Sequence, residues 1–92
     1  MAPPGIKGVS ENIRRKVTLY TKPGCHLCDE AKDEIAASGG KEFELVEINI
    51  AEDADLYEQY KHDIPVVLID GIEAFRHRLT AAEFLRALKQ NR

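Results

Sequence analysis

Long apolar runs are missing from this chain of 92 residues. The longest one, PVVLI at 65–69, is far below the roughly 18 residues that a helix needs to cross a bilayer. An excess of positive charge is missing as well, because 13 basic and 16 acidic side chains leave a net charge of −3. Such a chain lacks the basic surface that nucleic acid requires. We therefore expect no membrane partner and no nucleic acid partner.

Cysteine is also scarce, and the two residues present, Cys25 and Cys28, lie three positions apart. A structural zinc site takes four ligands, and His26, His62 and His77 do not have the spacing of a zinc finger. We therefore expect no metal site within one chain. A disulfide across so short a loop would constrain little of the unfolded chain, which disfavours a structural role. An iron–sulfur cluster shared between two chains stays open, since outside thiols could complete its ligands.

An apolar segment of the secretory kind is absent from the N-terminal residues MAPPGIKGVSENIRRK. Residues 1–15 are rich in Pro and Gly, and we expect them to form a flexible N-terminal extension. The remaining residues, 16–92, have the length of one domain. Without a secretory signal, the expected compartment is the cytoplasm, whose reducing conditions disfavour a permanent disulfide.

Residue patterns predict four strands and three helices, in the order β-α-β-α-β-β-α. The strands are expected at 16–21, 43–50, 66–70 and 72–76, and the helices at about 25–37, 53–61 and 80–89. Asp53 fits the N-cap of the second helix, and TAAE at 80–83 is a capping box that begins the third. A helix between the first two strands makes them parallel, whereas the turn at Asp70-Gly71 makes the last two antiparallel. The predicted fold is α/β, with a mixed four-stranded sheet flanked by helices.

The cysteine pair is placed where a strand gives way to a helix. Pro23-Gly24 ends the first predicted strand, which puts Cys25 at or beside the N-terminus of the first helix. Backbone N–H groups and the helix dipole favour negative charge there, so the pKa of Cys25 should fall below the free value of about 8.5. The Cys25 thiolate can then attack a disulfide in a partner. Cys28, one turn along and more buried, can attack the mixed disulfide and release the reduced partner.

Charged neighbours act on that thiolate in opposite senses. A protonated His26 between the cysteines would stabilise it, and Lys22, three positions before Cys25, can place a cation over the same site. The negative charges of Asp29 and Glu30 act against it. His26 and Lys22 fit the role of ordinary exposed turn residues equally well.

The segments YTKPGCHLCDEAK at 20–32 and HDIPVVLIDG at 62–71 resemble those of a glutaredoxin, a member of the thioredoxin-fold superfamily. More narrowly, the chain is similar to small glutaredoxin-like proteins whose physiological role is poorly defined. The resemblance covers about 16–90 and implies a thioredoxin-like fold. It also implies that Cys25 is the nucleophile and Cys28 the resolving thiol. Lys22 matches a lysine that helps to hold glutathione or to tune the thiolate.

The resemblance assigns substrate-binding roles to three further places. Ile64-Pro65 matches a turn in which the X-Pro bond is cis and the backbone before the proline pairs with the substrate. The segment AFRHRLT at 74–80 replaces a glycine pair that, in glutaredoxins, leads into the last helix and caps one end of glutathione. In it, Arg76 or Arg78 is a candidate for binding a carboxylate, and Thr80 is a candidate N-cap and substrate contact. Between the cysteines, His26-Leu27 replaces the usual Pro-Tyr.

The expected function is that of a thiol–disulfide oxidoreductase of glutaredoxin type, which reduces protein disulfides or glutathione mixed disulfides through Cys25 and Cys28. No tightly bound cofactor is implied, and glutathione is a candidate co-substrate. The expected form is a monomer. The alternative is a non-catalytic thioredoxin-fold module that carries an iron–sulfur cluster or docks a specific protein partner. The intact cysteine pair disfavours a purely structural role.

Overall fold

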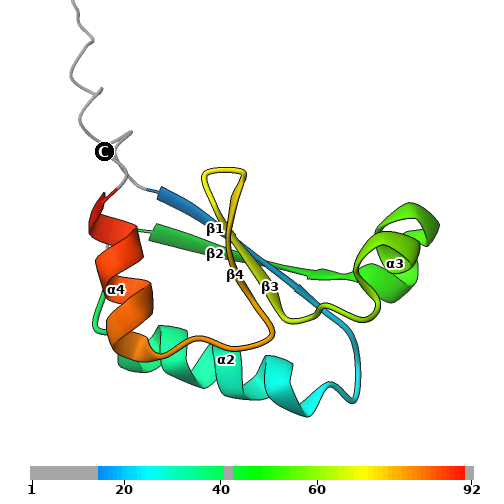
Figure 1. The fold of residues 1–92 in the computed structure, drawn as a ribbon, viewed down its shortest axis with the longest axis horizontal. Helices are drawn as coiled ribbons and strands as arrows, with labels where there is room; N and C mark the ends of the chain where they lie inside the picture. The colour runs from blue at the N-terminus through cyan, green and yellow to red at the C-terminus, as the bar shows by residue number, and fades with distance from the viewer. Residues whose placement is uncertain (1–14, 41–42, 91–92) are drawn as a thin grey trace, which may run out of the picture.

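The computed structural model describes residues 15–40 and 43–90 (Figure 1). Its elements follow one another as β1 (Arg15–Thr21), α2 (His26–Ala37), β2 (Phe43–Asn49), the short 3-10 helix η2 (Ile50–Glu52), α3 (Ala54–Tyr60), β3 (Val66–Ile69), β4 (Ile72–Arg76) and α4 (Ala81–Gln90). The predicted order of strands and helices is confirmed. Of the extension expected at residues 1–15, only Arg15 is described, and it is the first residue of β1. No described helix is both long and apolar enough to cross a membrane.

The strands form one mixed sheet in the order β2-β1-β3-β4. β1 runs parallel to β2 and antiparallel to β3, and β4 returns antiparallel to β3. The hairpin turns at Asp70 and Gly71, whose φ angles of 52° and 85° both lie in the left-handed region. A two-residue Asp-Gly turn of this kind matches the twist of the flanking strands. The predicted α/β fold with a mixed four-stranded sheet is therefore confirmed.

Two strand ends show how neighbouring groups move a boundary. β1 begins one residue earlier than predicted, where Arg15 donates from Nε to the Asp70 carboxylate and from Nη1 to the Leu88 carbonyl oxygen, both at 2.6 Å. β2 ends one residue earlier, because the Asn49 side chain caps the turn of η2 that begins at Ile50. The other element ends lie within one residue of the prediction, which is the ordinary uncertainty of a helix or strand terminus.

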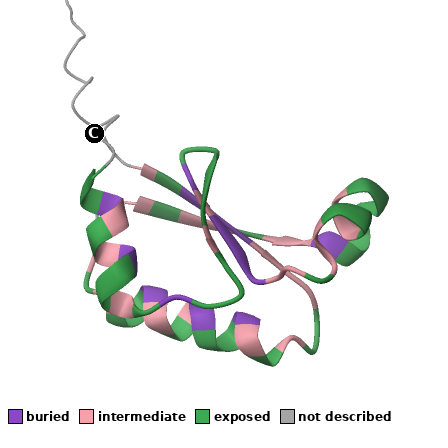
Figure 2. Cartoon of the chain, viewed as in Figure 1, coloured by how far each residue is buried: buried purple, intermediate pink, exposed green. Residues whose placement is uncertain are grey.

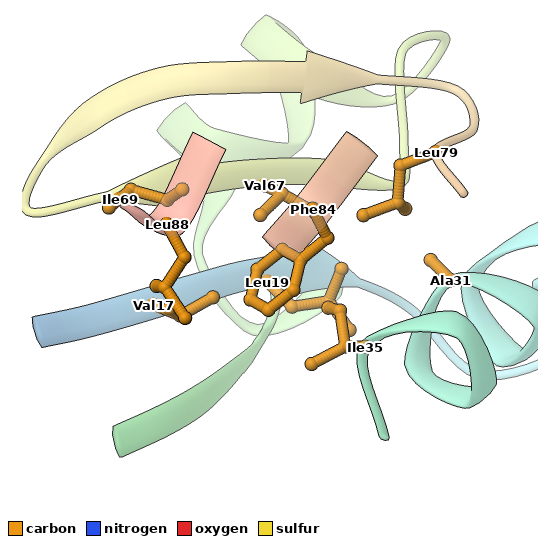
Figure 3. Packing of buried hydrophobic residues seen from close by; sticks show 9 residues of the cluster. All are labelled: Val17, Leu19, Ala31, Ile35, Val67, Ile69, Leu79, Phe84 and Leu88. Atoms are coloured by element: carbon orange, nitrogen blue, oxygen red, sulfur yellow. The ribbon is translucent and has the colours of Figure 1, made fainter. Parts of the chain in front are cut away.

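One face of the sheet is covered by α2 and α4, and the main apolar core lies between these helices and the strands (Figures 1 and 3). The buried cluster consists of Val17, Leu19, Ala31, Ile35, Val67, Ile69, Leu79, Phe84 and Leu88. Phe84 of α4 is 0% exposed, and its ring packs edge-on against that of Phe43, with 5.3 Å between the ring centres. Figure 2 shows buried positions along the strands and on the sides of α2 and α4 that face them.

The other face of the sheet is covered only in part. α3 is short, has no fully buried residue and lies toward the end of the sheet where β1 finishes (Figure 1). It contacts β1 through Tyr60, whose ring centre lies 4.8 Å from that of Tyr20. Burial raises the pKa of the Tyr20 hydroxyl, and the neighbouring Tyr60 raises it further. The helix on this face therefore packs against one end of the strands rather than along them.

This same end of the sheet brings two loops together. Tyr20 near the end of β1 is paired with Val66 at the start of β3. The loop 22–25, which follows β1, and the turn Ile64–Pro65, which precedes β3, therefore leave the sheet side by side. The first of these loops leads into α2 and carries Cys25.

Candidate redox site

Cys25 is the N-cap residue of α2, and the preceding turn fixes its position. Gly24 has a φ of +83°, which a residue with a side chain rarely adopts, and the Cys25 N–H donates to the Lys22 carbonyl oxygen at 3.2 Å. The Cys25 sulfur in turn accepts from the Cys28 N–H at 3.2 Å. A sulfur in this position lies at the positive end of the helix dipole, beside N–H groups that lack helical partners. Such a position stabilises a thiolate when the pair is reduced.

Cys25 and Cys28 are joined by a disulfide, and their Cα atoms lie 5.2 Å apart. The two residues differ in exposure, because Cys28 is 1% exposed whereas Cys25 is half-buried. An incoming thiol or disulfide therefore reaches Cys25 first. The predicted placement is confirmed, with one cysteine at the start of the helix and the other buried one turn along.

The two residues expected to tune the thiolate contact other groups in this disulfide form. His26 is exposed, and its Nε2 lies 3.4 Å from the carboxylate of Glu30 on α2. The Lys22 ammonium lies 5.8 Å from the centre of the Tyr57 ring of α3, and the Lys61 ammonium lies 5.6 Å from the same ring. A cation is attracted to an aromatic face at such distances. The tuning roles of Lys22 and His26 stay predictions.

The Ile64–Pro65 peptide bond is cis, as the resemblance to glutaredoxins implied. Pro65 is buried, and its carbonyl oxygen accepts from the His77 N–H at 2.8 Å. His77 has a φ of 75°, so the chain turns through the left-handed region directly after β4. The hydrogen bond ties the proline turn to the segment after β4. The role of this turn in holding a substrate backbone stays a prediction.

Arg76, expected to meet a substrate carboxylate, has carboxylate partners within the chain. Its Nε and Nη2 donate to Glu73 at 2.7 and 2.9 Å, and its Nη1 lies 2.8 Å from Asp63. The hydrogen bonding between Arg76 and Glu73 lowers the pKa of the Glu73 carboxyl and raises the pKa of Arg76. Asp63 also lies 3.6 Å from Nε2 of His77. Arg76 therefore links β4 to the segment just before Pro65.

Thr80, the other expected substrate contact, forms half of the capping box of α4. Its Oγ1 accepts from the Glu83 N–H, and its own N–H donates to the Glu83 carboxylate, both at 3.1 Å. The predicted capping box is confirmed. Glu34 of α2 adds a further bond, because its carboxylate accepts from the Ala81 N–H at 2.8 Å. Sequence reasoning missed Glu34, since its partner lies 47 positions away and no local pattern connects the two.

A pocket of about 540 Å³ lies between α2 and the segment that leads into α4. It is lined by Leu27, Glu30, Ala31, Asp33, Glu34, His77, Arg78, Leu79, Thr80 and Glu83. Of these residues, Leu27 lies between the two cysteines in the chain. Four of the lining side chains are carboxylates. Local sequence patterns did not predict that these four carboxylates gather around one pocket. In the part of the chain that the structure describes, no three His, Cys, Asp or Glu side chains are grouped to hold a metal ion.

Residues 16–89 match the family model described as Glutaredoxin-like domain (DUF836). The match spans most of the chain, so the protein belongs to this family. The mixed sheet, the flanking helices and the cysteine pair at a helix start accord with that family, and the protein is a glutaredoxin-like member of the thioredoxin superfamily.

Individual relatives support the same assignment. The Glutaredoxin-like protein YDR286C homolog of Dictyostelium discoideum is 32% identical over 77 residues, covering 76% of this chain and 68% of that protein. The X-ray structure of protein XcR50 from X. campestris has a TM-score of 0.71 at 26% identity and covers 83% of this chain and 99% of its own. Thioredoxin from Fasciola hepatica has a TM-score of 0.58 at 19% identity, covering 94% of this chain and 89% of its own. This last likeness concerns the fold alone.

Proposed function

We propose that this glutaredoxin-like protein is a thiol–disulfide oxidoreductase that reduces protein disulfides or glutathione mixed disulfides. The observation that carries the proposal is the position of the Cys25 sulfur at the start of α2, 3.2 Å from the Cys28 N–H. A structural disulfide needs neither an accessible sulfur nor a helix terminus. Redox exchange benefits from both, because a thiolate must form near neutral pH and must reach its target.

The reaction begins with the reduced pair. The Cys25 thiolate attacks one sulfur of the substrate disulfide, whose S–S bond breaks, and the leaving thiolate takes a proton from solvent. Cys28 then loses its proton and attacks the Cys25 sulfur, which is within reach because the two residues lie one helical turn apart. The second substrate thiol leaves as the Cys25–Cys28 disulfide forms. Two electrons have then passed from the protein to the substrate.

In this proposal the Ile64–Pro65 turn holds the substrate backbone beside Cys25. Support comes from the sheet, which brings the turn next to the loop 22–25, and from the His77 N–H, which ties Pro65 at 2.8 Å. An extended segment can gain affinity at such a place through main-chain hydrogen bonds. The proposed substrate is therefore an extended segment that carries a protein disulfide or a glutathionylated cysteine. We propose that the protein acts as a monomer in the cytoplasm, where a reductant regenerates the dithiol.

Substitution of each cysteine tests this function. Cys25→Ser is expected to abolish single-turnover reduction of a peptide disulfide by the pre-reduced protein, because the attacking thiolate is gone. Cys28→Ser is expected to keep the first exchange at Cys25 and to lose internal release. Wild-type turnover by Cys25→Ser contradicts the proposal. If the wild-type protein reduces no disulfide, but shows visible absorbance that depends on Cys25 after anaerobic purification, the iron–sulfur alternative replaces it.

A further inference from the structure

The start of α4 lines the pocket, and the N–H groups of Thr80, Ala81 and Glu83 already have partners. The Ala81 N–H donates to the Glu34 carboxylate at 2.8 Å, and the Thr80 N–H donates to the Glu83 carboxylate at 3.1 Å. The Glu83 N–H donates to Thr80 Oγ1 at 3.1 Å. A helix N-terminus with free N–H groups attracts anions. Here two carboxylates of the protein occupy that position, one of them brought in from α2.

The rest of the pocket carries the same sign of charge. Glu30 and Asp33 add to Glu34 and Glu83, so four carboxylates line the pocket together with one guanidinium, that of Arg78. Leu27, two residues after Cys25, lines the pocket, so a peptide or glutathione bonded to the Cys25 sulfur can extend over this surface. Such a group therefore lies over a surface whose charge is predominantly negative.

Besides Arg78, which lines the pocket, three further cations have other partners. Arg76 contacts both Glu73 and Asp63, as described above, and does not line the pocket. Lys22 and Lys61 lie over the Tyr57 ring of α3. The negative surface beside the disulfide is therefore set chiefly by the protein's own α2 and α4.

We propose that Glu34, supported by Glu83, determines the specificity of the oxidoreductase activity proposed above, on which this inference rests. The Glu34 carboxylate occupies the Ala81 N–H and places a negative charge at the start of α4, which works against anionic ligands there. The site then favours disulfides with neutral or cationic groups beside the reacting sulfur, and works against glutathione, which carries two carboxylates. The substrate class is a mixed or protein disulfide with a neutral or basic neighbourhood. The overall exchange stays balanced: reduced protein and mixed disulfide give oxidised protein and two thiols.

One peptide with a single cysteine provides the test. It is capped with glutathione in one sample and with cysteamine, whose free group is a cation, in the other. The pre-reduced wild-type protein is expected to reduce the cysteamine-capped peptide about fivefold faster or more, which is the effect of one like-charge pair about 4 Å apart in a water-like dielectric. The ratio should shrink between about 0.05 M and about 0.5 M NaCl, because salt screens exposed charges.

Two variants of Glu34 separate the effect of its negative charge from the effect of its hydrogen bond to the Ala81 N–H. Glu34→Gln removes the charge but keeps an oxygen that can accept from the Ala81 N–H, so the fold is expected to persist. Glu34→Ala removes both and frees that N–H for an outside anion. The preference for the cysteamine cap is expected to fall in Glu34→Gln and to fall further in Glu34→Ala. The matched control is Glu44→Gln, since Glu44 is exposed on β2 and paired with Lys16 at the end of the sheet away from Cys25.

The outcomes distinguish this inference from the function on which it rests. A wild-type protein that reduces both capped peptides at equal rates and at every salt concentration overturns the inference and leaves the oxidoreductase function standing. The same holds if folded Glu34 variants keep the wild-type ratio, or if Glu44→Gln changes it equally. A wild-type protein that reduces neither peptide overturns the proposed function, and the inference falls with it.

Discussion

The electrostatics of the Cys25 sulfur depend on individual side chains as well as on the helix. In the disulfide form, the Lys22 ammonium lies over Tyr57, 5.8 Å from the ring centre. Reduction creates a negative charge at Cys25, three residues from Lys22 along the chain. Since the lysine stem is flexible and the turn 22–25 is short, we expect the thiolate to compete with Tyr57 for the same cation.

Lys22→Gln is therefore expected to raise the pKa of the Cys25 thiol, because the thiolate loses a nearby positive charge. The pH dependence of iodoacetamide alkylation, measured in a Cys28→Ser background, reports this pKa directly. Lys32→Gln is the matched control, since Lys32 lies on α2 and pairs with Glu47 of β2 at 3.4 Å. An equal shift in both variants would show that only net charge matters and that Lys22 has no direct role.

At the scale of single residues, the sequence predicted contacts between groups that lie close together along the chain and missed contacts between distant groups. Asp53 was predicted to cap α3, and its Oδ1 accepts from the N–H groups of Asp55 and Leu56 at 3.0 and 3.1 Å. Cys25 was predicted at a helix start by the same local logic. Two other contacts depend on how distant segments pack, and no local residue pattern predicts them. They join Glu34 to α4 and Arg76 to Asp63.

At the scale of elements, the β3–β4 hairpin is held to β1 by its turn. Asp70 accepts from the Lys16 N–H at 3.0 Å and from Arg15 Nε at 2.6 Å. The bond from the Lys16 N–H is the larger cause that lowers the pKa of the Asp70 carboxyl, and the bond from Arg15 lowers it further. Because the folded-state pKa is lowered, this contribution to stability is present above the ordinary aspartate pKa of about 3.9 and is lost as the pH falls through the folded-state value.

Asp70→Asn is expected to reduce the free energy of unfolding near neutral pH by less than about 1 kcal/mol, since the carboxylate is exposed and well screened. Asparagine tolerates the left-handed φ of 52°, so the turn itself is kept. Urea denaturation near pH 7 and near pH 3 measures the change, which should shrink at the lower pH. A difference that is the same at both pH values would show that the carboxylate charge is not its cause.

The end of β4 is linked to the proline turn through Arg76 and Asp63, which lies two residues before Pro65. Arg76→Gln is expected to loosen that turn and, under the proposed function, to raise KM for a peptide disulfide by up to about tenfold, because binding must then order it. The value of kcat should change less. Arg86→Gln on the exposed side of α4 is the control, and an equal loss in both variants would leave Arg76 without a positioning role.

Element type was predictable from local patterns, whereas the extent of packing was not. A run of β-branched, apolar and aromatic residues identified β1, and the Asp70-Gly71 pair identified the hairpin that leads to β4. The same patterns did not reveal that α3 covers only one end of its face of the sheet. Leu56, Tyr57 and Tyr60 of α3 are only partly buried, and Tyr60 packs against Tyr20 near the end of β1.

At the scale of the whole molecule, stability depends mainly on the core between α2, α4 and the sheet. Phe84→Ala is expected to lower the free energy of unfolding by about 3–5 kcal/mol, because it leaves a cavity where a fully buried ring stood. Ile72→Ala removes a large apolar side chain that is 66% exposed, and should cost less than about 0.5 kcal/mol. Denaturant unfolding of both variants checks the contrast, and similar losses would contradict a core centred on Phe84.

The bond from Arg15 Nη1 to the Leu88 carbonyl oxygen brings the start of β1 next to the last turn of α4. Both lie at one end of the sheet, while the loop with Cys25 leaves the other end (Figure 1). A tether or reporter attached through either terminal element therefore starts on the side remote from the sulfur. Immobilised on a surface in that way, the domain would present its disulfide outward to whatever solution flows past.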